Sequence, residues 1–285
     1  MRHSSIVLLI ACAGSAVAAK PAPLDRPGAS EAAMSPDPNG ARPMAAVDTV
    51  WIEQLTWMEV RDALRAGKTT VIIPTGGVEQ NGPYLVTGKH NVILSATAEA
   101  TARKLGDALI APIVPFVPEG DIDPPSGSMR YPGTITVEAT TYEALLRDIA
   151  QSMKAHGFKA IVFIGDSGGN QKGMHDVAER LNKAWAGSGT RALFVPEYYD
   201  WPGRQKWLAA RGYKEIDQGI HDELAAESIM LSVDPASVRM KERIAAGKFS
   251  VNGVALAPAD KTIATGKALV DHIADMTAQA IRKAR

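Results

Sequence analysis

The chain has 285 residues, of which 46% are hydrophobic and 22% are charged, a composition typical of globular proteins. Lys and Arg together number 31, as do Asp and Glu, so the formal net charge is zero. Nucleic acids and anionic membranes are bound by basic patches, and this charge balance gives no sign of one. Small molecules or peptides are therefore the expected partners, with no nucleic acid and no membrane beyond an export signal.

Residues 1–19 have the three parts of a signal peptide. A basic start precedes a mostly apolar stretch at 6–17, and the segment 16–18 (AVA) fits the small-x-small cleavage rule. An exported protein, periplasmic or secreted, is the expectation. Cys12, the only cysteine, follows Leu9-Ile10-Ala11 and also fits a lipoprotein-processing site. Cleavage after Ala18 leaves a chain without cysteine, which excludes disulfides and thiolate metal ligands.

Two further parts follow the signal peptide. Residues 20–48 are dominated by Pro, Gly, Ala and Ser, which bury too little apolar area to offset chain entropy, so they predict a flexible linker. Residues 49–285 have a suitable length for one domain with a sizeable core.

Within this domain, short apolar runs alternate with longer segments of 3.6-residue periodicity. Strands buried on both faces are expected at 69–74, 108–116, 160–164 and 191–196. Helices are expected at 91–105, 138–156, 171–185 and 262–283, with Gly157 capping the second. This alternation predicts an α/β fold of three layers, with helices on both faces of a mainly parallel sheet.

Three loops follow predicted strands, at 75–91, 118–134 and 165–170. In parallel sheets, ligands bind beyond the carboxyl ends of the strands. We therefore expect these three loops to meet at one edge of the sheet and to carry the functional residues.

The loop sequences resemble those of a known family. EQNGPYLVTGKHN at 79–91 is similar to the E-Q-H-G-P-H-L-P-L-G-T-D motif of the creatininase family of metal-dependent amidohydrolases. GDSGGN at 165–170 falls where that family has N-G-H-G-G-N, and HDELAAESIML at 221–231 resembles its H-A-G-E-x-E-T-S-L-M-L stretch. The chain thus resembles a divergent, exported member. The resemblance implies a layered α/β/α fold, a homo-oligomer, and divalent metal that activates water for attack on an amide carbonyl.

The metal ligands that this resemblance implies are only partly retained. Glu79 matches the motif glutamate, and His90 replaces the usual bridging aspartate. Asn81 stands where a ligand histidine is usual, and Ser167 replaces the histidine of H-G-G-N. The remaining set favours one divalent ion per chain, zinc, manganese or iron, over two.

The same resemblance suggests roles for further residues. Glu227, next to the position of the family's acidic residue, is expected to be the third metal ligand, after Glu79 and His90. His221 is expected to move protons, with Glu223 as an assisting carboxylate. The expected substrate-binding residues are Asn81, Tyr84, Arg130, Gly168 and Gly169, the two glycines through an oxyanion contact of their amides.

Two other functions remain open from the sequence. The substitutions at Asn81, Ser167 and Ala226 are also compatible with a non-catalytic binding protein on the same scaffold. Alternatively, the G-x-S-x-G pattern around Ser167 fits the nucleophile elbow of a serine hydrolase, with Asp200 and either His221 or His272 completing the triad.

Overall fold

A computed structural model describes residues 36–285 of the chain. The predicted signal peptide, Cys12 and the first part of the predicted linker lie outside these residues. The chain divides into residues 1–41 and residues 42–285. In the described part of the first unit, the backbone N–H of Gly40 donates to the carbonyl of Asp37 at 3.1 Å. None of the helices in 36–285 is sufficiently long and apolar to cross a membrane.

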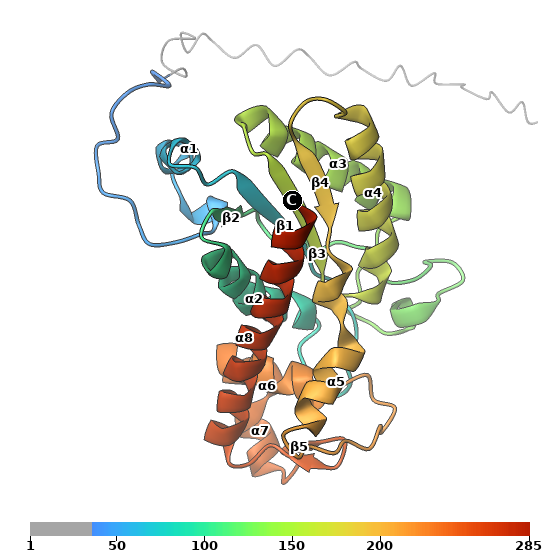
Figure 1. Ribbon diagram of the computed structural model, residues 1–285. Helices are drawn as coiled ribbons and strands as arrows, with labels where there is room; N and C mark the ends of the chain where they lie inside the picture. The colour runs from blue at the N-terminus through green and yellow to red at the C-terminus, as the bar shows by residue number, and fades with distance from the viewer. Residues whose placement is uncertain (1–35) are drawn as a thin grey trace, which may run out of the picture. The chain divides into compact units, whose positions relative to one another are not determined.

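The second unit is built on a four-stranded parallel sheet in the order β2-β1-β3-β4 (Figure 1). The strands are β1 (Thr70–Thr75), β2 (Ala108–Ile110), β3 (Ala160–Gly165) and β4 (Arg191–Phe194). All residues of β1, β2 and β3 are buried, as expected of strands covered on both faces. The expected parallel sheet is therefore confirmed.

The second strand is shorter than the apolar run at 108–116 predicts. It ends at Ile110, and only an isolated bridge between Val114 and Thr75 continues the pairing. Pro112 and Pro115 lack the N–H that a ladder needs, which accounts for the early end.

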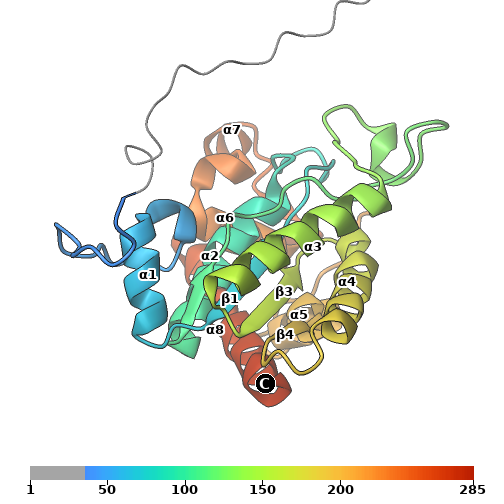
Figure 2. The same ribbon diagram turned by 90° about the horizontal axis from the view of Figure 1, so that it is seen from above.

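Helices cover both faces of the sheet (Figure 2). On one face, α3 (Ala139–His156) and α4 (Gln171–Ala184) pack on Val71, Ile73 and Phe163. On the other, α2 (Lys89–Leu105) and α8 (Ala259–Ala284) pack on Ile72 and Val162. Successive strand residues point to opposite faces, so each strand contributes to both cores and the three-layer α/β/α arrangement is confirmed.

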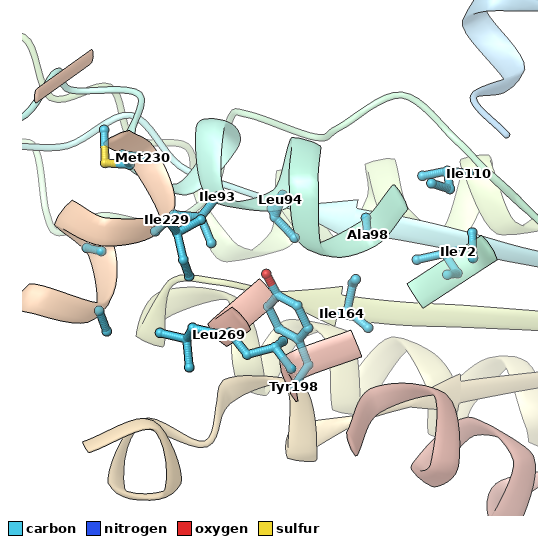
Figure 3. Packing of buried hydrophobic residues seen from close by; sticks show 14 of the residues in the cluster. Ile72, Ile93, Leu94, Ala98, Ile110, Ile164, Tyr198, Ile229, Met230 and Leu269 are labelled. Atoms are coloured by element: carbon cyan, nitrogen blue, oxygen red, sulfur yellow. The ribbon is translucent and has the colours of Figure 1, made fainter. Parts of the chain in front are cut away.

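The structure contains several smaller elements that the sequence patterns did not predict. These are α1 (Trp57–Arg65), α5 (Trp201–Ala209), α6 (Leu224–Val233), α7 (Met240–Ala245) and the antiparallel pair β5 (Ser250–Val251) and β6 (Val254–Ala255). Helix α6 is buried almost all round, which removes the one-sided apolar pattern of a surface helix. Figure 3 shows its Ile229 near Ile93 of α2 in the core, to which Met230 also belongs.

The contact between α6 and α8 is so close that it requires a glycine. A Cβ built on Gly266 of α8 would lie 1.9 Å from the carbonyl oxygen of Ser228 in α6. Alanine would raise the helix propensity by up to about 1 kcal/mol. The overpacking costs about 1–3 kcal/mol, so Gly266→Ala should lower the free energy of unfolding in urea titrations. The neighbouring exposed substitution Lys267→Ala should change it by less than about 0.5 kcal/mol.

Candidate active site

The loops that follow β1, β2 and β3 meet at the carboxyl edge of the sheet, as predicted. They bring together Glu79, Glu119 and Asp166, and the first turn of α2 adds His90. All four side chains are buried. Gly77 permits this close approach, because a Cβ there would lie 2.3 Å from Oε1 of Glu119 and 3.3 Å from Cδ2 of His90.

A line of alternating charges runs through the cluster. Nε2 of His90 lies 2.7 Å from Oε1 of Glu79, and its Nδ1 lies 2.9 Å from Oδ2 of Asp166. The guanidinium of Arg204 donates to Oδ1 of Asp166 at 3.3 and 3.4 Å. Ser128 donates to Oε2 of Glu79 at 2.5 Å. Both ring nitrogens of His90 thus face carboxylate oxygens, which only accept hydrogen bonds when ionised.

The pKa values at the cluster follow from these contacts. Burial by itself raises the pKa of Glu79, but the hydrogen bonds from His90 and Ser128 outweigh it and lower the value to about 2. Burial opposes the charged form of His90, yet its bonds to Asp166 and Glu79 raise its pKa above the usual range. Glu79 is therefore ionised at neutral pH and forms the anionic centre of the site.

Glu119 has the opposite character. Burial, together with the negative charge of Glu79, raises its pKa to about 8, so it is mostly protonated at neutral pH. Oε2 accepts from Ser167 at 3.4 Å, whereas the enclosed Oε1 has no hydrogen-bond partner. Glu79 and Glu119 are thus neighbouring carboxyl groups whose environments push their pKa values apart.

His221 approaches the cluster from the solvent side. Its Nε2 lies 3.8 Å from Oε1 of Glu79, and its Nδ1 lies 3.0 Å from the backbone carbonyl of Gln80. The residue has a positive φ of 57°, an uncommon conformation that points to a functional constraint. Burial, then the charge of Lys89, lowers its pKa below the usual value, so the imidazole is neutral and able to accept a proton.

Glu223 lies beside His221 on the wall of a cavity of about 400 Å³. Burial raises its pKa to about 7, and its Oε2 accepts from Gln205 at 3.2 Å. The cavity residues are Gln205, Glu215, Asp217, His221, Asp222, Glu223 and Asn252. His221 therefore connects an open cavity to the buried anion of Glu79.

The raised pKa of Glu223 predicts a pH-dependent stability. The folded state holds the proton up to about pH 7, whereas the unfolded carboxyl loses it near 4.5. The neutral carboxyl of Glu223 therefore contributes fully to the free energy of unfolding below pH 4.5, and this contribution is lost as pH rises through 7. Glu223→Gln should gain stability relative to the parent between pH 5 and pH 7.5, on the order of 1–3 kcal/mol in urea titrations. Parallel profiles of parent and variant would contradict this.

The remaining residues predicted for the site lie in other environments. Glu227 forms a buried ion pair with Arg243 at 2.5 Å, and Tyr84 lies against the same guanidinium, 4.2 Å from ring centre to carbon. Asn81 braces its own loop by donating to the carbonyl of Glu79 at 2.8 Å. Arg130 is exposed and donates to the carbonyl of Gly127 at 3.2 Å. None of these contacts involves His90. Glu227 and Tyr84 contact Arg243 instead and are not part of the proposed site.

Ser167 is part of the cluster but has no bonded histidine. Its hydroxyl donates to Glu119 and accepts the N–H of Gly169 at 3.4 Å. A serine nucleophile needs a neighbouring base such as histidine. Within residues 36–285 the geometry thus assembles no Ser-His-acid triad, and the amide of Gly169 is engaged by Ser167. Gly168 begins the short 3-10 helix Gly168–Asn170 beside it.

The sequence patterns did not indicate Glu119, Asp166 and Arg204 as site residues. Glu119 and Asp166 follow the ends of apolar runs, at the edge where ligands bind, and this position is a signal that could have identified them. Arg204 has no such signal, because it lies in α5 and reaches the cluster only through the tertiary fold.

A mainly parallel α/β/α fold with acid and base groups converging at the carboxyl edge of its sheet defines a hydrolase-like class of site. The family model of creatininase, described as creatinine amidohydrolase, matches residues 53–281. The chain belongs to the creatininase family. Members of this family are metal-dependent amidohydrolases.

Individual relatives share only a low sequence identity with this chain. The creatinine amidohydrolase of Pseudomonas putida is 23% identical over 195 residues, covering 66% of this chain and 73% of the relative. A mycofactocin precursor peptide peptidase of Mycolicibacterium smegmatis is 24% identical over 224 residues, covering 75% and 84%. A solved creatininase in a manganese form has a TM-score of 0.62 at 20% identity and covers 83% of this chain and 98% of its own. The fold is thus conserved far better than the sequence.

The donor groups fit one divalent ion better than two. Glu79 and His90 are a carboxylate and an imidazole, and Asp166 orients the second nitrogen of His90, as is usual around metal-binding histidines. An ion there would replace the proton between His90 and Glu79. The positions of two usual histidine ligands hold Asn81 and Ser167, an amide whose buried Oδ1 has no hydrogen-bond partner and a hydroxyl that donates to Glu119. Neither is as good a ligand for zinc as imidazole, so the donors for a second ion are weak. No three His, Cys, Asp or Glu side chains in residues 36–285 are grouped around a metal position, which leaves further coordination to water.

Proposed function

We propose that this protein is a metal-dependent hydrolase of a C–N bond in a small amide, cyclic or linear, and that the Glu79 cluster is its active site. The observation that carries the proposal is the convergence of ionised Glu79, His90 and the neutral base His221 beside an open cavity. Names of family relatives, an amidohydrolase and a peptide peptidase, support an amide or peptide bond as the target.

The reaction needs a water molecule, a base and a proton donor. His221 takes a proton from water on Nε2 as the water oxygen bonds to the carbonyl carbon, and the C=O electron pair moves onto oxygen. When the C–N bond breaks, the nitrogen receives that proton from His221 and leaves as an amine. Glu223, with a pKa of about 7, is placed to exchange the proton with solvent.

Glu79 and His90 would hold one zinc, manganese or iron ion. Bound there, a divalent ion polarises the carbonyl and lowers the pKa of bound water. Asp166 fixes the orientation of His90, and Arg204 in turn holds Asp166, so the cluster is rigid before substrate binds.

We also propose that the protein acts after export, in the periplasm or outside the cell, and as a homo-oligomer. The basic, apolar and small-residue segments of residues 1–19 support export. Detection of the mature chain in a periplasmic fraction, and light scattering of the purified protein, are the two tests.

A panel of linear amides, dipeptides and lactams tests the reaction. The purified protein is incubated with each compound, with added zinc or manganese and with a chelator, and products are detected by mass spectrometry. Metal-dependent release of an amine supports the proposal. Absence of turnover throughout the panel favours the non-catalytic binding protein, and labelling of Ser167 by a fluorophosphonate probe that chelators do not affect favours the serine hydrolase.

A further inference from the structure

Lys89, in the GKHN segment, is a buried cation without a protein partner. Only 3% of the residue is exposed, and within residues 36–285 its ammonium makes no ion pair and no hydrogen bond. The ammonium is not among the enclosed side-chain atoms that lack a partner, so it still touches solvent. The other buried cations differ, since Arg204 pairs with Asp166 and Arg243 with Glu227.

The position is also unfavourable for a lysine on structural grounds. Lys89 is the first residue of α2, a helix of 17 residues whose N-cap, Gly88, offers no side-chain acceptor. The positive end of the helix dipole repels a cation there and attracts an anion. Burial of an unpaired charge is costly in addition. A buried lysine that makes no ion pair and no hydrogen bond within residues 36–285 is therefore explained by a ligand.

The ammonium lies near the cavity of the active site. Burial raises the pKa of Glu223 and the charge of Lys89 is the largest effect opposing it. Burial lowers the pKa of His221 and Lys89 lowers it further. Both residues line the cavity of about 400 Å³, whereas Lys89 itself is not one of its lining residues, so a ligand that contacts Lys89 extends from this cavity toward the first turn of α2.

We propose that Lys89 binds a carboxylate of the substrate. The carboxylate is present in the substrate before the reaction, so it pairs with the buried ammonium of Lys89 as soon as the substrate binds. The positive N-terminus of α2 adds to the attraction. One negative charge matches one ammonium, whereas a phosphate dianion would bring a second charge that the ammonium does not balance. The inference rests on the proposed function for the location of substrate and narrows its class to amides that carry a carboxylate.

Matched probes test this inference by binding alone. N-acetylglycine and its neutral analogue N-acetylglycinamide are titrated into the purified full chain by calorimetry. The parent should bind the carboxylate more tightly, and Lys89→Met should weaken that binding roughly tenfold to hundredfold while leaving the amide unaffected. Lys89→Arg should retain the preference. Lys172→Met is the matched control, because Lys172 also lies in the first turn of a helix but is 85% exposed.

Thermal unfolding separates a ligand-binding lysine from a structural one. Loss of an unpaired buried charge should leave the melting temperature of Lys89→Met equal to or above that of the parent. Failure of this variant to fold, equal binding of both probes by the parent, or tighter binding of inorganic phosphate would overturn the inference. If Lys89→Met loses the preference for the carboxylate probe but the parent hydrolyses no amide of the panel, the inference is upheld and the proposed hydrolysis is rejected.

Discussion

Glu79→Ala should abolish C–N bond hydrolysis, with kcat/KM reduced by about 100-fold or more, while the protein remains folded. Glu79 is the ionised group around which His90, Ser128 and His221 are arranged. Without it, His221 loses its anionic neighbour and the metal loses its carboxylate ligand. The measurement is steady-state kinetics on the best substrate of the amide panel, with circular dichroism as the check on folding.

Glu53→Ala provides the matched control, because Glu53 is an exposed carboxylate away from the sheet edge. Its kinetics should equal those of the parent within twofold, a tolerance of about 0.4 kcal/mol. A folded Glu79→Ala variant that keeps parental kcat/KM would remove Glu79 from the mechanism.

Arg204→Met should cause the largest loss of stability, about 3–5 kcal/mol in the free energy of unfolding. Arg204 is 1% exposed and is shared between the carboxylate of Asp166 and the carbonyl of Tyr198, to which it donates at 2.8 Å. Its guanidinium also lies 4.5 Å from the ring centre of Trp201. Methionine fills the space but leaves Asp166 with a buried charge and one fewer partner. Urea titration measures the loss.

Arg211→Met is the comparison for this prediction. Arg211 is exposed and its guanidinium stacks on Trp207, 3.4 Å from the ring centre, without a buried carboxylate. Its replacement should cost about 1 kcal/mol or less. Equal losses in the two variants would show that the ion pair with Asp166 does not contribute beyond packing.

The sheet and its main helices were predictable because their signals are local. Strands β1 and β3 each contain a continuous run of at least four apolar residues. Helix α3 ends at His156 and is capped by Gly157, whose φ of 106° suits only glycine well. The missed helix α6 shows the limit. Its residues are buried by contacts with α2 and α8, far away in the chain, so no one-sided periodicity marks it.

The site was predictable in part, for a similar reason. Glu79, His90 and His221 belong to recognisable motifs, and the structure brings them together. Glu227 shares a motif with His221, yet the turns of α6 direct its carboxylate to Arg243 instead. Which of several nearby carboxylates joins a cluster depends on side-chain direction and on pairing with distant arginines, and neither is encoded in spacing.

Metal content tests the central claim most directly. The full chain is purified without chelator, and inductively coupled plasma mass spectrometry is applied to the parent and to Glu79→Ala. We predict about one zinc, manganese or iron ion per chain in the parent and almost none in the variant, as expected for an ion held by two protein ligands and water. A folded parent free of metal, or a variant with unchanged metal content, would contradict a metal-dependent hydrolase centred on Glu79.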